Sequence, residues 1–278
     1  MLKLIGKSEK AALVGKNINL TYNRLLEQID HYAELLHNIS KERVVIFSEN
    51  RPEWIVALYA VWKTGSIVVP IDALSAQEDI VVILRDSNPR AVFCSEEKHD
   101  AMLQALKEAG QMPDVHVFDH IADDQSLHDP EDFNIHDPEQ TAVILYTSGT
   151  TGNPKGVMLS FQNIHTNIIA VSHDVVIYTP EDRVMILLPF HHVLPLVGTI
   201  IAPLCVGATM VLNTSLAAED LIAIGLQMKR LLLGGGPDLI SFGRFRRGAD
   251  RLRPDGRPPG PGHGPRAWRR SRLRRPSS

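Results

Sequence analysis

Cysteine is scarce in this sequence, and its scarcity excludes two kinds of site. The 278 residues include two cysteines, Cys94 and Cys205, which lie far apart and form no CxxC pair. A disulfide framework or a cysteine-based zinc site would need more cysteines at closer spacing. The sequence therefore indicates a reducing compartment. Because no long apolar segment follows Met1, we expect no signal peptide and a cytoplasmic location.

Charged side chains are missing from residues 184–218. Within this stretch, residues 193–212 form a run that is long and apolar enough to raise a membrane-spanning helix as an alternative. Pro195 and Pro203 interrupt the run, and no basic cluster flanks it. We therefore predict a buried helix followed by a buried strand, and we leave open a peripheral contact with a membrane.

The charge of the chain is divided unevenly along its length. Residues 1–228 carry 15 basic and 29 acidic side chains, whereas residues 229–278 carry 14 basic and 3 acidic ones. Thirteen of these 14 basic residues are arginines, so the overall formal charge of −3 hides the division. Two different kinds of sequence therefore share one chain.

Residues 236–278 are rich in arginine, glycine and proline and lack the hydrophobic periodicity that builds a core. We predict a disordered basic tail, and we interpret it as out-of-frame translation of a GC-rich gene, with an onset between residues 229 and 245. The alternative is a basic arm that binds nucleic acid or an anionic membrane. Aromatic residues for base stacking are few in this part of the chain, so we expect no nucleic-acid partner.

Residues 1–235 alternate between strand and helix patterns. Apolar residues at spacings of three and four predict a helix from Leu25 to Leu36, with Thr21 as its cap. Runs of β-branched residues predict strands, and a polar stretch at residues 120–140 predicts a surface connection. The alternation indicates an α/β fold with mostly parallel strands. The predicted strands span residues 43–48, 66–71, 91–95, 115–118, 141–146 and 183–188, and the further helices span residues 52–63, 75–86, 98–109 and about 160–172, with another starting near residue 216.

The segment 147–157, with the sequence TSGTTGNPKGV, carries the most chemical information. It combines three glycines, four hydroxyl side chains and one lysine between a predicted strand and a predicted helix. Glycines let backbone N–H groups approach an anion, hydroxyls add donors, and a lysine supplies a full positive charge. This composition is typical of a polyphosphate-binding loop, although it does not match the Walker A pattern. A flexible surface loop of small residues is the alternative.

The order of residues in YTSGTTGNPKGV resembles the signature loop of the adenylate-forming superfamily, which includes acyl-CoA synthetases, peptide-synthetase adenylation domains and luciferases. Three further segments resemble the same family, namely LTYNRLLEQI, VVIFSENRPEWIVALYAVWKTGSIVVPID and LLPFHHVLPLVGTIIAPLCVGATMVL. The resemblance covers about residues 1–235. It implies a partial AMP-binding domain there, which is the N-terminal large-domain portion of the family fold, with mostly parallel sheets flanked by helices.

The resemblance also implies roles for individual residues. Lys155 would neutralise phosphate charge during transfer, and Thr150 or Thr151 would lie near the Mg²⁺-bound phosphates. His192 falls at an aromatic-or-histidine position beside the carboxylate and the α-phosphate. Its neighbour His191 is the competing candidate, and either could instead be an ordinary core or rim histidine. The residues implied to wrap the β- and γ-phosphates of ATP are Thr147, Ser148, Gly149, Thr150, Thr151 and Gly152.

The implied activity is that of an AMP-forming acyl-CoA synthetase that uses ATP, Mg²⁺ and coenzyme A. The apolar run 193–212 and the paired histidines favour a long-chain fatty acid as the substrate. The family's later motifs are not found after residue 160, and Lys229 is the only lysine after Lys155. We therefore expect an inactive or impaired fragment. The alternatives are an adenylation domain that loads an acyl carrier protein, an aryl-CoA ligase, and a non-catalytic nucleotide- or nucleic-acid-binding protein with a basic arm.

Overall fold

The fold is that of a computed structural model of the 278-residue chain. It describes residues 1–122, 129–148, 154–170, 177–212, 231–233 and 241–242. The chain divides into two compact units, Met1–Phe245 and Arg246–Ser278, and the second lies wholly outside the described residues. The helix predicted near residue 216 and nearly all of the predicted tail also lie outside them, so their nature stays a prediction.

The first unit contains a six-stranded sheet in which all neighbouring strands but one pair run parallel. Its order is β10-β9-β5-β4-β6-β7, and the antiparallel pair is β9 with β10. Parallel strands deliver their carboxyl ends, and the loops that follow, to one edge of the sheet. The strands are β4 (Arg43–Phe47), β5 (Ile67–Ile71), β6 (Ala91–Cys94), β7 (Asp114–Val117), β9 (Thr141–Ser148) and β10 (Pro154–Ser160).

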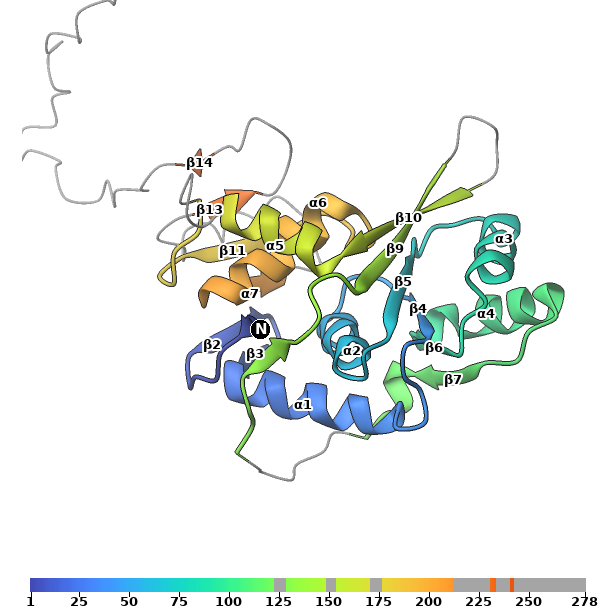
Figure 1. The fold of residues 1–278 in the computed structure, drawn as a ribbon, viewed down its shortest axis with the longest axis horizontal. Helices are drawn as coiled ribbons and strands as arrows, with labels where there is room; N and C mark the ends of the chain where they lie inside the picture. The colour runs from blue at the N-terminus through green and yellow to red at the C-terminus, as the bar shows by residue number, and fades with distance from the viewer. Residues whose placement is uncertain (123–128, 149–153, 171–176, 213–230, 234–240, 243–278) are drawn as a thin grey trace, which may run out of the picture. The chain divides into compact units, whose positions relative to one another are not determined.

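Helices cover both faces of this sheet, as Figure 1 shows for α1 and α2 on one side and α3 and α4 on the other. Along β4, Val44 and Ile46 join the core that contains α1 and α2, whereas Val45 and Phe47 join the core that contains α3 and α4. Successive side chains of a strand point to opposite faces, so a strand covered on both sides is apolar throughout. The predicted α/β fold, with mostly parallel sheets flanked by helices, is confirmed. The helices are α1 (Tyr22–Leu35), α2 (Pro52–Lys63), α3 (Gln77–Ser87) and α4 (Glu96–Ala109).

A second six-stranded sheet brings the N-terminal residues beside strands from much later in the chain. Its order is β14-β13-β11-β12-β2-β3. Strand β2 runs parallel to β12, with Leu13 opposite Met210, and the hydroxyl of Tyr22 donates a hydrogen bond to the carbonyl oxygen of Ala208. The strands are β2 (Ala11–Gly15), β3 (Ile18–Thr21), β11 (Arg183–Ile186), β12 (Thr209–Leu212), β13 (Leu231–Leu233) and β14 (Ser241–Phe242).

Strand structure also occurs where the sequence pattern does not predict it. The stretch 120–140, expected to be a surface connection, contains β8 (Phe133–Ile135), which pairs with β1 (Leu2–Ile5) and buries Phe133 and Ile135. The N-terminal strands β1, β2 and β3 are likewise not predicted. Their sequences, LKLI, AALVG, INLT and FNI, contain no run of β-branched residues of the kind that predicted the other strands. Their formation depends on partners that are distant in sequence.

The junction after the predicted phosphate loop also differs from expectation. The sequence predicts that the loop leads directly into a helix, whereas strand β10 lies between the loop and α5 (Phe161–Ile169). Strand β10 has the sequence PKGVMLS, in which apolar and polar residues do not alternate, so the sequence pattern did not predict it. Its residues Val157 and Met158 are exposed although they are apolar. The helix itself begins close to the expected position, where Ser160 and Asn163 form a reciprocal capping box. The segment 149–153 therefore connects the two strands of a hairpin.

The uncharged run 193–212 forms a helical segment and then a buried strand; the helical segment is mostly buried, as predicted, but its first residues Val193 and Leu194 are exposed. It contains α6 (Val193–Pro195), the π-helical η3 (Leu196–Ile201), α7 (Ala202–Val206) and β12. Leu196, Ile200 and Leu204 are fully buried in the main core. Among the described residues, no helix combines the length and the apolarity needed to cross a membrane.

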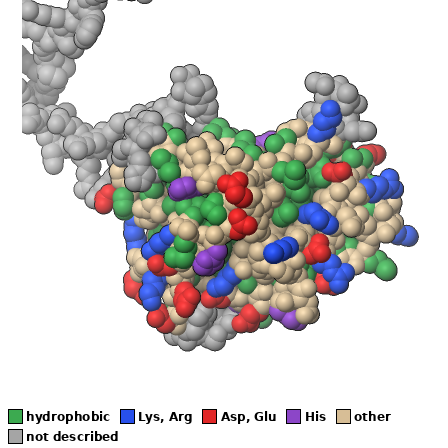
Figure 2. All heavy atoms as spheres, viewed as in Figure 1, with side chains coloured by type: hydrophobic (Ala, Val, Ile, Leu, Met, Phe, Trp, Pro, Cys, Tyr) green, Lys and Arg blue, Asp and Glu red, His purple; other side chains and the backbone are tan. Residues whose placement is uncertain are grey.

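Charges of both signs cover the face of the molecule seen in Figure 2, where basic and acidic side chains are interspersed. Two exposed pairs join the N-terminus to the segment before β8, namely Lys3 with Asp132 at 2.6 Å and Lys7 with Asp129 at 3.0 Å. Exposed pairs of this kind each contribute about 0–1 kcal/mol. The stability of the fold therefore depends mainly on its apolar core.

His116 on β7 makes the fold sensitive to acid. Its ring lies 5.1 Å from that of Phe93, its Nε2 atom is buried without a hydrogen-bond partner, and burial lowers the pKa of its imidazole. The unfolded chain, in which this histidine has its ordinary pKa of about 6.5, therefore binds more protons than the folded chain. The contribution of His116 to stability is complete above pH 6.5 and falls as the pH drops below it.

We expect the free energy of unfolding to decrease between pH 7 and pH 5, by at most about 1.4 kcal/mol per pH unit for each proton that the unfolded chain takes up in excess. Urea unfolding curves at pH 7, 6 and 5, followed by circular dichroism, measure this change. The variant His116→Phe, which keeps the ring contact but cannot bind a proton, should show a shallower dependence. An identical pH dependence in both proteins would contradict the assignment.

Candidate active site

The hairpin of β9 and β10 carries the stem of the predicted phosphate loop. Lys155 lies directly opposite Thr147 in the antiparallel pairing, and both side chains are exposed. Residues directly opposite each other project to the same face of a sheet. The structure therefore places a lysine and a threonine on the same face near the end of the hairpin, and their ammonium and hydroxyl groups form a donor set that suits phosphate oxygens.

The next pair along the hairpin fixes the stem to the first sheet. Gly156 lies opposite Tyr146, and a Cβ atom at Gly156 would stand 2.8 Å from Cγ2 of Ile144 and 3.2 Å from Cζ of Tyr146. A side chain at Gly156 would therefore collide with Ile144 and crowd the ring of Tyr146. The hydroxyl of Tyr146 donates a hydrogen bond to Asp86 of α3, and burial raises the pKa of this phenol, so it stays a donor. The hairpin stem is thus anchored to α3.

The tip of the hairpin is not described. Gly149, Thr150, Thr151 and Gly152 lie outside the described residues, and Ser148 ends β9 with a side chain that is not described. Among the described residues, no group of three His, Cys, Asp or Glu side chains could hold a metal ion. The proposed Mg²⁺ contacts of Thr150 and Thr151 therefore stay predictions.

The two candidate histidines lie in the segment that follows β11. We call residues 188–192 the histidine corner. His191 is half-buried, with Nε2 at 3.6 Å from Oδ2 of Asp72, and its ring centroid lies 4.0 Å from that of His192. Burial lowers the pKa of His191 by more than the nearby carboxylate raises it, so this imidazole is mainly neutral at pH 7. His192 is exposed and precedes the first residue of α6. The histidine that was predicted to meet substrate is therefore the one that faces solvent.

The hairpin and the histidine corner meet the same edge of the first sheet. Strands β5 and β9 are parallel neighbours, with Val68 opposite Val143. Asp72 lies four residues after Val68, and Thr147 lies four residues after Val143, so both are near the carboxyl ends of these neighbouring strands. Asp72 in turn faces His191. The structure thus brings the predicted phosphate-binding residues and the predicted histidines to one edge, where parallel α/β sheets bind their ligands.

Asn50, which sequence reasoning did not single out, joins this edge to the histidine corner. Its Nδ2 atom donates to the carbonyl oxygen of Leu188 at 2.9 Å, and its Oδ1 atom accepts from the backbone N–H of Phe190 at 3.0 Å. Asp72 was also missed. Both residues follow soon after the carboxyl end of a buried parallel strand, and this position was the signal in the sequence that could have identified them.

The chain is similar in sequence to known enzymes. The family model for AMP-binding enzymes matches residues 5–226. The mitochondrial malonate–CoA ligase of Xenopus laevis is 30% identical over 221 residues, which cover 74% of this chain and 37% of that protein. The sulfoacetate–CoA ligase of Cupriavidus necator is 35% identical over 187 residues, covering 65% of this chain and 36% of that protein. This chain thus spans little more than a third of the length of these two relatives.

The solved structures show the same fold. ATP-bound MatB from Rhodopseudomonas palustris superimposes with a TM-score of 0.69 at 22% identity. The match covers 80% of this chain and 46% of that one. The arrangement of sheets and helices described above is therefore that of the matching part of a known enzyme fold.

Proposed function

Since the chain belongs to the AMP-binding enzyme family, we propose that it is the N-terminal part of an AMP-forming acyl-CoA ligase. The observation that supports this proposal best is the pairing of Lys155 with Thr147 at the edge where Asp72 meets His191. This edge offers a cation and a hydroxyl donor for phosphate oxygens, together with a solvent-facing imidazole from His192. ATP and a carboxylic acid would bind along it, with coenzyme A as the acceptor or, in the alternative, an acyl carrier protein.

The reaction proposed for the whole enzyme has two steps. A carboxylate oxygen attacks the α-phosphorus of ATP, which breaks the bond to pyrophosphate and gives an acyl-adenylate. A thiol sulfur then attacks the acyl carbon, forms the thioester and releases AMP, while the thiol proton passes to solvent. In this scheme Lys155 balances the negative charge of the phosphates, and the hydroxyl of Thr147 donates to a phosphate oxygen. Magnesium, which would bind with ATP near Thr150 or Thr151, would reduce the negative charge of the phosphates.

The acid that reacts is a separate question. The apolar run 193–212 suggested a long-chain fatty acid, but its residues Leu196, Ile200 and Leu204 are buried in the main core. Packing therefore accounts for the apolar character of the run without a long acyl chain. The relatives compared above are named for malonate and sulfoacetate, two short acids that each carry a second anionic group. The fatty-acid assignment stays a prediction, as does the cytoplasmic location, and a test must include short dianionic acids.

Two measurements on the 278-residue chain test the proposal. Isothermal titration calorimetry with MgATP should show binding, because the hairpin stem is present and folded. ATP–pyrophosphate exchange with malonate, sulfoacetate or palmitate should stay at background, because the chain spans only 37% of a complete relative. Absence of MgATP binding would contradict the proposed site. Exchange that depends on one of the acids would show that the chain is active by itself and would identify its substrate.

A further inference from the structure

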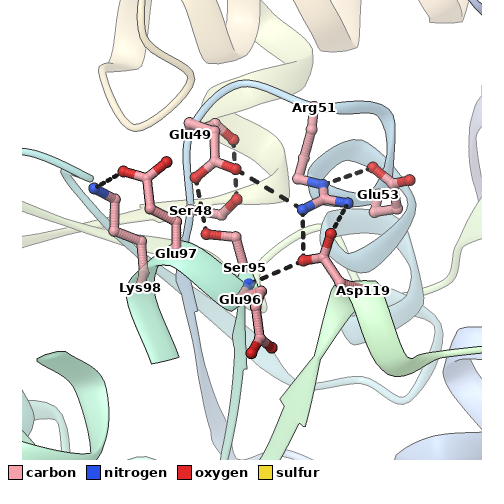
Figure 3. A network of polar contacts seen from close by, with 9 residues as sticks. All are labelled: Ser48, Glu49, Arg51, Glu53, Ser95, Glu96, Glu97, Lys98 and Asp119. Carbon is pink, nitrogen blue, oxygen red and sulfur yellow. Dashed lines mark hydrogen bonds and ion pairs between the residues drawn. The ribbon is translucent and has the colours of Figure 1, made fainter. Parts of the chain in front are cut away.

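The turn after β4 is held in place by a network of polar contacts, shown in Figure 3. Arg51 donates two hydrogen bonds to the carboxylate of Asp119, at 2.9 and 3.1 Å, and a third to Glu53 at 2.8 Å. On the other side of the turn, the hydroxyl of Ser95 donates to Glu49 at 2.8 Å. The turn is therefore tied to the segments that follow β6 and β7.

The Arg51 pair has the geometry of a strong contact. The guanidinium meets Asp119 through two parallel hydrogen bonds and lies 5.4 Å from the ring centroid of Phe118, and its side chain is 20% exposed. The hydrogen bond from Arg51 holds the pKa of the Asp119 carboxyl below its ordinary value. A planar cation held at two points has little freedom to move. The backbone next to it, which includes Asn50, is fixed as a result.

Asn50 uses both ends of its amide on one partner segment. Its N–H group donates to the carbonyl oxygen of Leu188, and its oxygen accepts from the N–H of Phe190. The side chain thus makes the pair of backbone hydrogen bonds that a neighbouring strand would otherwise make. The partner residues lie 138 and 140 positions away in sequence. Beside these bonds, the ring of Trp54 packs edge-on against Phe190 at 5.3 Å. Phe190 immediately precedes His191 and His192.

We infer that Asn50 is a positioning residue, which sets where the histidine corner stands relative to the sheet that carries the phosphate hairpin. The network around Arg51 fixes the conformation of the turn. The amide of Asn50 then holds the backbone of Leu188 and Phe190 against this turn, and the position of Phe190 sets the position of the two histidines that follow it. An amide suits this task because it offers one donor and one acceptor in one plane. Any effect of Asn50 on MgATP binding rests on the proposed function, whereas its positioning of the histidine corner does not.

The test compares the 278-residue protein with Asn50→Ala and Asn50→Asp. In Asn50→Ala, protection of the Phe190 amide against hydrogen exchange should fall about tenfold, because one hydrogen bond is lost. In Asn50→Asp at pH 7, the introduced carboxylate still accepts from Phe190 but repels the carbonyl oxygen of Leu188, so NMR signals of the His191 and His192 rings should shift. Once this carboxyl is protonated, below a pKa that its own ¹³C NMR signal reports, it has the donor and acceptor of the original amide, so these signals should return to those of the unchanged protein at the same pH. Asn50→Ala should not recover.

Asn19→Asp, at an exposed position of β3, is the matched control, since it adds the same charge away from the corner. Histidine ring signals and Phe190 protection that stay the same in all variants would overturn the positioning role. A disturbance of Asn50→Asp that persists after its carboxyl has become protonated would overturn the assigned donor–acceptor geometry. MgATP affinity is measured in parallel. If even the unchanged protein does not bind MgATP, the proposed function fails, while the pH-dependent recovery still decides the role of Asn50.

Discussion

Replacing Trp54 with alanine should lower the free energy of unfolding by about 3–5 kcal/mol, the usual cost of truncating a large buried aromatic side chain. Trp54 is 1% exposed and is among the largest fully buried side chains of the chain's described part. Its ring lies on α2 and packs edge-on against Phe190 of the histidine corner. The truncation would remove apolar burial and leave a cavity between the first sheet and the segment that follows β11. Urea unfolding followed by circular dichroism measures the loss.

Two further variants show how much of this loss of stability comes from the buried aromatic ring. Trp54→Phe keeps an aromatic ring and should cost distinctly less than Trp54→Ala. Leu74→Ala removes a side chain that is 87% exposed and should change stability by about 0.5 kcal/mol or less. If Trp54→Ala lowered the free energy of unfolding no more than Leu74→Ala does, the contact between α2 and the histidine corner would not contribute to stability.

Replacing Lys155 with methionine should weaken MgATP binding by about ten- to a hundredfold, since hydrogen bonds to charged groups contribute about 1.5–3 kcal/mol. Methionine keeps much of the length of the side chain but removes its charge. Lys155 is exposed on β10, so the fold should change little. Isothermal titration calorimetry measures the affinity, and circular dichroism verifies the fold. The difference between the two proteins should shrink as salt is added, because screening weakens the attraction.

The matched control is Lys16→Met, which removes an equal charge from an exposed position near the β2–β3 hairpin. It should leave MgATP affinity within a factor of two to three of the unchanged protein. An equal loss in both variants would attribute the effect to net charge. No loss in Lys155→Met would remove this lysine from the phosphate site.

Local sequence predicted the parts of the fold that depend on local physics. Thr21 was expected to cap the first helix, and its Oγ1 atom does accept a hydrogen bond from the N–H of Arg24. The apolar run of β4 indicated a strand buried on both faces, and this is what the two core clusters contain. The short pair of β1 and β8 was missed, because the strand that pairs with each of them lies more than a hundred residues away in sequence.

The sequence predicted the phosphate loop of the candidate site but not the contacts that position it. The order of residues around the glycine-rich loop was enough by itself to indicate the family. It could not show that Lys155 stands opposite Thr147, because that depends on the strand β10 and its register. The amide of Asn50 bonds to residues 138 and 140 positions away, and such contacts leave no periodic pattern in a single sequence. Tertiary geometry was needed to find them.

The pairing of β2 with β12 affects how the chain can fold while the ribosome is still synthesising it. Leu13 is synthesised early, whereas its partner Met210 comes almost two hundred residues later. At a synthesis rate of about 5–20 residues per second, β12 is made roughly 10–40 seconds after β2. Strand β2 has no β12 to pair with during this time. The first sheet obtains its strands between residues 43 and 160 and can assemble earlier. During that interval the nascent N-terminus exposes apolar surface that chaperones recognise.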